Sequence, residues 1–106
     1  MDISAETTVI TATSVPAGSY IAMFFGDVLV GQLSCTLEAP SGTAIAFGAP
    51  TGFPPATMSI VEVATLASSA NVRVLCSNGG PPAAITNTRL MLIRTGAIDA
   101  ADVTPV

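Results

Sequence analysis

The sequence predicts an all-β fold, namely an antiparallel β-sandwich of six to eight short strands. Runs in which apolar and polar residues alternate recur along the chain, and this period of two is typical of strands with one buried face. Clusters of Gly, Pro, Ser and Asn separate the runs, as in sandwiches and barrels. Helix signals are almost absent, because the many alanines are scattered among residues that favour strands and turns.

Three strands are expected in the first half of the chain, and they span residues 7–13, 19–25 and 28–38. The first alternates regularly and ends before a Pro-Ala-Gly segment. The second is apolar on both parities, that is, at its odd- and its even-numbered positions, which point to opposite faces of a strand. Gly26 and Asp27 are expected to turn the chain after it. The third is long, and Gly31 is expected to mark a bend or a bulge within it.

Four further strands are expected in the second half, and they span residues 43–47, 57–66, 72–77 and 90–95. The Gly- and Pro-rich segment 48–55 cannot be the interior of a strand. One parity of the two final strands is expected to make the subunit core, and its members are Val72, Val74, Cys76, Leu90 and Leu92. The last strand is apolar on its other parity too, whereas an antiparallel strand normally keeps one face in water.

The length predicts one domain over residues 1–106, with residues 1–6 as an N-terminal arm and residues 97–106 as a polar tail. The spacing of the strands fits a jelly roll or a related Greek-key sandwich best. An immunoglobulin-like sandwich is the alternative, and the absence of the core Trp that such domains often carry weakens it.

The composition argues against several classes of partner. Charged residues make up 9% of the chain, against about 25% in typical proteins. The net charge is -4, and the only basic side chains are Arg73, Arg89 and Arg94. A surface that binds phosphate needs clustered Lys and Arg, so no nucleic-acid partner is expected, and an anionic membrane would repel the chain. No apolar run reaches the ~18–20 residues of a membrane span, and the acidic N-terminus does not resemble a secretory signal.

The two cysteines, Cys35 and Cys76, share the parity of core-facing residues. The first interpretation is two buried thiols that act as small hydrophobes. A disulfide between adjacent strands is the alternative, and it requires Cα atoms within about 7 Å of each other. The sequence leaves the pairing open, and with it the redox compartment.

The chain lacks the residues on which most catalytic mechanisms depend, so neither an enzymatic activity nor a cofactor is expected. The chain has no His and no Lys, and two cysteines are too few for a structural zinc site. Glu38 and Glu62 are the candidates for a carboxylate pair, as in glycosidases. We expect Glu38 to lie in solvent at a strand end, and Glu62 to be an outward residue or an arginine partner. Asp27, Asp99 and Asp102 lack the loop spacing of calcium sites, so no metal is expected.

Arg94 shares the parity of Leu90 and Leu92, so strict alternation would point it into the core. The preferred explanation is a strand end that is already leaving the core. A bulge that shifts the register, or an acidic partner across a subunit interface, would also explain it.

The feature that does indicate a function is the number of apolar residues expected to point away from the core. Apolar residues on three of the expected strands lie opposite to the core parity, and they are expected to form a subunit interface: Ile21, Met23, Phe25, Leu75, Met91 and Ile93. Several such residues make a patch of several hundred Å², which monomers rarely leave exposed. Closed homo-oligomers are the usual solution.

An ordered set of short motifs also carries a family resemblance. The set comprises Gly18-Ser19-Tyr20-Ile21, Leu33-Ser34-Cys35-Thr36-Leu37, Val72-Arg73-Val74-Leu75-Cys76, Asn87-Thr88-Arg89-Leu90 and Ile93-Arg94-Thr95-Gly96. Over roughly residues 7–96 the chain resembles small β-sandwich domains of actinobacterial and phage structural proteins. Their layout is similar to that of tumour-necrosis-factor-like jelly rolls, whose trimers pack through the sheet that contains the last strand. The departures are Pro81-Pro82 and the very low charge.

The resemblance implies a virion protein, namely a capsid decoration (cement) protein that sits as a homotrimer on the outside of a phage head. Its partner would be the major capsid protein, and it would be assembled in the host cytoplasm. The alternative is a receptor- or carbohydrate-binding head domain of a phage fibre or of a secreted adhesion protein. Sugar sites usually present aromatic platforms, and only Tyr20 and four Phe residues are available for them.

Overall fold

The computed structural model describes residues 2–3, 6–50, 55–78 and 83–95, which form eight strands. The strands are β1 (Asp2–Ile3), β2 (Thr7–Val15), β3 (Gly18–Val30), β4 (Leu33–Glu38), β5 (Ala44–Gly48), β6 (Ala56–Leu66), β7 (Ala70–Asn78) and β8 (Ala83–Thr95). The prediction of an all-β antiparallel sandwich is confirmed. Within the described ranges, no helix is long and apolar enough to cross a membrane.

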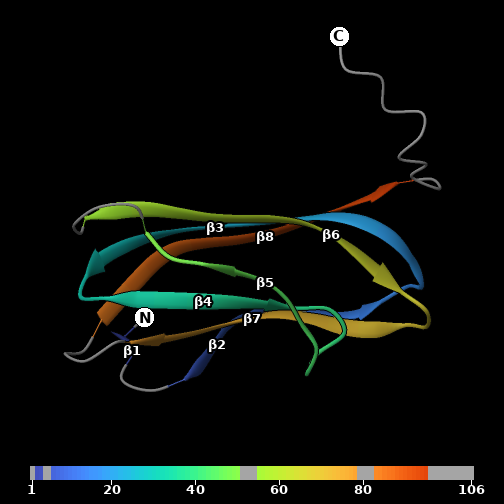
Figure 1. Ribbon diagram of the computed structural model, residues 1–106, viewed down its shortest axis with the longest axis horizontal. Helices are drawn as coiled ribbons and strands as arrows, with labels where there is room; N and C mark the ends of the chain where they lie inside the picture. The colour runs from blue at the N-terminus through green and yellow to red at the C-terminus, as the bar shows by residue number, and fades with distance from the viewer. Residues whose placement is uncertain (1, 4–5, 51–54, 79–82, 96–106) are drawn as a thin grey trace, which may run out of the picture.

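Two antiparallel sheets form the two layers that are visible in Figure 1. The β3 sheet has the strand order β1-β8-β3-β6, and the β7 sheet has the order β2-β7-β4-β5. β1 pairs with β8, β2 with β7, β3 with β6 and β4 with β5, so the chain resembles one long hairpin wrapped back onto itself. This arrangement is the jelly roll that the strand spacing predicts.

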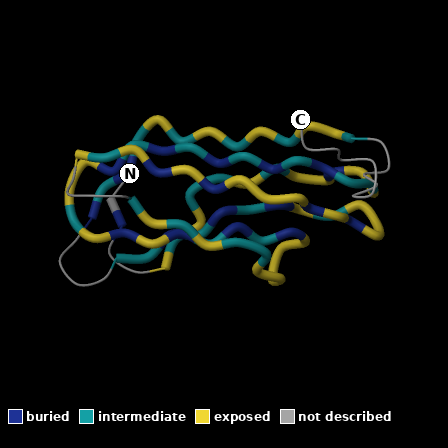
Figure 2. The backbone as a smooth tube through the Cα atoms, turned by 45° about the horizontal axis from the view of Figure 1, so that its top comes forward, coloured by how far each residue is buried: buried dark blue, intermediate teal, exposed yellow. Residues whose placement is uncertain are grey.

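The core lies between the two sheets, and β3, β4, β6 and β7 contribute alternate buried residues to it. Buried and exposed positions alternate along the strands in Figure 2. The fully buried side chains include Phe24, Leu37 and Ile85, one from each of β3, β4 and β8. The core residues predicted for the two final strands are confirmed: Val72, Val74 and Cys76 are buried, and Leu90 and Leu92 pack against the buried cluster.

The predicted turn at Gly26 and Asp27 is wrong, because both residues lie inside β3. Gly26 is needed for packing. A Cβ atom at this position would lie 2.7 Å from Cδ1 of Ile85, so the Ile85 side chain would have to shift to admit any larger residue. The turn comes later, and Gly31 has a positive φ of 86° there. The single strand predicted over residues 28–38 is therefore two strands, the end of β3 and all of β4.

The N-terminal segment differs from the predicted arm. Asp2 and Ile3 form β1, which pairs with Ala84 and Ala83 of β8, and the Ile3 side chain is fully buried. The predicted tail over residues 97–106 lies outside the described residues.

The two cysteines form a disulfide between β4 and β7, so the structure has the second of the two arrangements considered. Cys35 and Cys76 are directly opposite each other in the register, with Cα atoms 4.0 Å apart. Each is only 1% exposed. The bond therefore joins two neighbouring strands of one sheet inside the core, next to Met58 of the other sheet.

Candidate subunit interface

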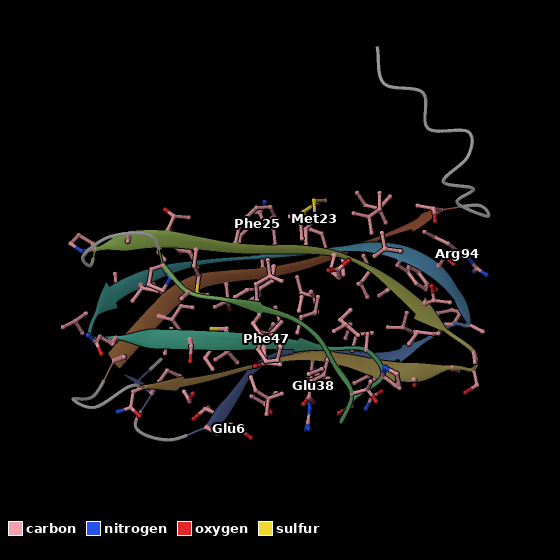
Figure 3. All side chains as sticks on the ribbon, viewed as in Figure 1. Glu6, Met23, Phe25, Glu38, Phe47 and Arg94 are labelled. Atoms are coloured by element: carbon pink, nitrogen blue, oxygen red, sulfur yellow. A yellow bond between two sulfur atoms is a disulfide. The ribbon has the colours of Figure 1, made fainter. Side chains whose placement is uncertain are left out.

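Three neighbouring strands turn a row of apolar side chains to the outer side of the β3 sheet. The register aligns β6, β3 and β8, so that Val63, Ile21 and Ile93 share one row and Val61, Met23 and Met91 share the next. Phe25 continues the apolar surface in the following row. Figure 3 shows Met23 and Phe25 pointing away from the interior of the sandwich. We call this surface the outer apolar face; it comprises Ile21, Met23, Phe25, Val61, Val63, Met91 and Ile93.

Much of the outer apolar face is open to solvent. The side chains on its two flanking strands are the most exposed, at 59% for Val61, 49% for Val63 and 45% for Ile93. The three residues of the central strand are half-buried by these neighbours. Strands about 4.8 Å apart and rows about 7 Å apart give about 34 Å² per residue, so the seven residues cover a footprint of about 240 Å². Monomers rarely expose contiguous apolar patches larger than a few hundred Å², so a patch of this size is a candidate contact surface.

Polar residues limit the outer apolar face at both ends. At one end Ser19 is aligned with Thr65 and Thr95, and the Ser19 and Thr65 hydroxyls lie 3.5 Å apart. At the other end the Asp27 carboxylate accepts hydrogen bonds from Nδ2 of Asn87 at 2.9 Å and from Oγ1 of Thr57 at 3.4 Å. An apolar centre with a polar rim is the usual composition of a protein interface.

A β-bulge in β8 determines which side chains reach this face. Asn87 has a φ of 53°, and the register between β3 and β8 shifts at this point. Before the shift Ile85 points into the core, and after it Leu90 does. Without the extra residue, strict alternation from Ile85 would turn Met91 and Ile93 inward. The bulge therefore places them outside.

Five of the six predicted interface residues lie together on the outer apolar face, namely Ile21, Met23, Phe25, Met91 and Ile93. Leu75 does not join them. It lies in β7, half-buried on the outer side of the other sheet, and its register partners are Thr8 and Thr36. Period-two parity says that a residue points outward from its own sheet, but it does not say which of the two sheets that is.

Val61 and Val63 contribute two of the most exposed side chains of the face, and they are not among the residues predicted from the sequence. Both valines lie on the side of β6 opposite to its core residues, and this position in the alternation could have identified them. Ser59 and Thr65 on the same parity made that face resemble an ordinary solvated one. Only the pairing of β6 with β3 shows that the two valines adjoin Ile21 and Met23.

The outer side of the β7 sheet has a different character. Its aligned residues include Ser34 with Ser77, and Thr36 between Phe47 and Leu75. Phe47 is 77% exposed, but it lies alone on the short edge strand β5. Hydroxyl groups therefore interrupt the apolar residues on this side, and the extended apolar surface belongs to the β3 sheet.

Glu38 and Glu62 are not brought together, because they lie on different sheets. The expectation that Glu38 lies in solvent is wrong: its side chain is 15% exposed and forms an ion pair with Nε of Arg73. The Arg73 guanidinium and the backbone N–H of Gly42 hold the pKa of the Glu38 carboxyl below its ordinary value of 4.5. Glu62 is exposed on the edge strand β6 and accepts the N–H of Val63 at 3.0 Å.

Arg94 lies at a strand end that leaves the core, as the preferred explanation predicts. Its side chain is exposed, although Leu92 two residues earlier still packs against the core. Nη2 of Arg94 donates a hydrogen bond to the backbone carbonyl of Ala17 at 3.0 Å. Figure 3 places Arg94 at one end of the sandwich, beside the connection from β2 to β3.

Asp27 belongs to no group of three or more potential metal ligands within the described part of the chain; Asp99 and Asp102 lie outside that part.

Comparison of the chain with protein-family models, with curated proteins and with solved structures finds no match.

Proposed function

We propose that this chain is a non-enzymatic structural protein of a virion, a capsid decoration protein that assembles as a homotrimer on the outer surface of a phage head. The observation that carries the proposal is the outer apolar face. Burying a footprint of about 240 Å² at ~25 cal/mol per Å² contributes about 6 kcal/mol per copy. The cost of association is about 4–15 kcal/mol, so contacts of this size from several copies support a cyclic oligomer.

The virion setting comes from the resemblance of the ordered motifs to phage structural domains. Two further observations support a structural role. The chain contains neither His nor Lys, and its candidate carboxylate pair, Glu38 and Glu62, is divided between the two sheets. A rigid sandwich with a buried disulfide also suits a particle surface, where a subunit must persist outside the cell.

Co-sedimentation with undecorated capsids tests the proposal. The wild-type chain is expected to bind capsids to saturation, with a number of copies that is a multiple of three. The Met23→Glu variant is expected to bind at least tenfold more weakly, because a charge on the outer apolar face prevents trimer formation. Failure of the wild-type chain to sediment with any capsid would contradict the proposal, and specific retention on a glycan array would favour the receptor-binding alternative.

A further inference from the structure

The outer side of the β3 sheet carries two charged side chains on β3, β6 and β8, and they have opposite signs. Asp27 follows Phe25 on this side of β3, and Arg89 lies directly opposite Phe25 in β8. The remaining outward positions of the three strands are apolar, hydroxyl-bearing or amide side chains. Both charges therefore adjoin the same end of the outer apolar face.

Neither charge is neutralised by a residue in the described ranges of the chain. The Asp27 carboxylate is hydrogen-bonded to Asn87 and Thr57, which are neutral donors. Arg89 is exposed, and the one ion pair in the described part of the chain joins Arg73 to Glu38. Two neutral donors hold the Asp27 carboxylate in place, and the Arg89 guanidinium is exposed next to an apolar surface. These two groups are suited to pair across an interface.

We propose that the outer apolar face packs against a second copy of this chain about a rotation axis parallel to the strands, so that Arg89 of one copy faces Asp27 of the next. The inference rests on the self-association proposed above. Rotation about such an axis keeps every residue at its own height along the strands, so the charged ends of two copies meet. Arg89 and Asp27 differ in height by two residues, about 7 Å, which an arginine side chain can span.

The opposite orientation is disfavoured by the same charges. A two-fold axis perpendicular to the strands would reverse one copy against the other. With the axis at the Met23 row, Asp27 would face the hydroxyl row of Ser19, and Arg89 would face the apolar row of Ile21. Two charges would then lose water without gaining a charged partner. Electrostatic complementarity thus selects between two packings that bury the same apolar residues.

Mixing two charge-reversal variants tests this contact. Asp27→Lys alone places a lysine against Arg89 of the next copy, and Arg89→Glu alone places a glutamate against Asp27. Each variant by itself is expected to associate at least tenfold more weakly than the wild type in light scattering after size exclusion. An equimolar mixture is expected to regain association at least tenfold stronger than either variant alone, because two of the three contacts in a mixed trimer then pair opposite charges and only one keeps like charges.

The mixture separates contact between copies from contact within one chain, because no single molecule in it contains both reversals. Arg94→Glu is the matched control: it reverses a charge on the same strand but at the parity of the other side, so association is expected to be unchanged. If Asp27→Lys fails to fold by circular dichroism, Asp27→Asn replaces it and must bind Arg89→Glu more tightly than Arg89→Glu binds itself. A mixture that stays dissociated, while the wild type associates and Met23→Glu does not, overturns this packing and leaves the self-association standing. A monomeric wild-type chain overturns both.

Discussion

Glu38 and Arg73 form an ion pair where the end of β4 lies beside the first half of β7. The two residues are register partners, and the carboxylate also accepts the N–H of Gly42 at 2.9 Å across the turn that follows β4. The pair is only partly exposed, so water screens it less than a fully exposed surface pair. It ties the last strand position before the turn to the neighbouring strand.

The lowered pKa of Glu38 makes stability depend on pH. The carboxyl has a lower pKa in the folded state than its ordinary value of 4.5, so its contribution is fully present above pH 4.5 and is lost as the pH falls through the folded pKa. Glu38→Gln is expected to lower the free energy of unfolding at pH 7 and to flatten its decline below pH 4.5. Urea unfolding over a pH series measures both. A Glu38→Gln variant whose stability declines below pH 4.5 as steeply as that of the wild type would contradict this.

Gly26 tests the close approach of β3 to Ile85. Gly26→Ala places a methyl group 2.7 Å from Cδ1 of Ile85, and overpacking of this kind costs about 1–3 kcal/mol. Ile85→Val removes that δ-methyl group, so the double variant is expected to lose less than the sum of the two single losses. Additive losses in chemical denaturation would show that Ile85 is not the obstacle.

The bulge in β8 is the element on which the outer apolar face depends. Asn87 adopts a positive φ and donates a hydrogen bond to Asp27, and both Asn87→Gly and Asn87→Ala remove that bond. Only alanine pays a steric cost for the left-handed conformation, so we expect the alanine variant to be about 1–2 kcal/mol less stable than the glycine variant. Equal stabilities in thermal unfolding would mean that the bulge does not require this backbone conformation.

The disulfide joins two elements that are already paired in the sheet. Its partners are 41 residues apart in the sequence, and a loop of that length predicts a stabilisation of about 4 kcal/mol in the chain-entropy model. Unfolding of the Cys35→Ala/Cys76→Ala variant is expected to show a loss of that order. The native bond should react with reductant only after unfolding, because both sulfurs are buried. Reduction as fast in water as in denaturant would contradict this.

At the scale of elements, alternation located most strands because a strand with one wet face repeats every two residues. It misjudged Gly26, since a glycine needed for close packing cannot be distinguished from a turn glycine without knowledge of Ile85. It also could not locate the bulge at Asn87. The parities of Leu90 and Met91 were nevertheless right, because they were counted within the last strand and not from Ile85.

At the scale of the whole molecule, the two outer surfaces of the sandwich differ in kind. The β3 sheet presents a continuous apolar surface with polar ends, and the β7 sheet presents hydroxyl groups, an ion pair and the isolated Phe47. The sequence predicted an interface from residues of the right parity. It grouped Leu75 with residues of the other sheet because the assignment of strands to sheets depends on long-range pairing, which the local pattern does not contain.

The central claim is that the outer apolar face, and no other surface, joins copies of the chain. Light scattering after size exclusion tests it with the wild type, Met23→Glu and Phe47→Glu. Phe47 is the more exposed residue but lies on the other sheet, so it controls for a charge placed on any exposed apolar side chain. We expect an oligomeric wild type, an oligomeric Phe47→Glu variant and a folded, monomeric Met23→Glu variant. A monomeric wild type, or an oligomer dissociated by Phe47→Glu and not by Met23→Glu, would contradict it.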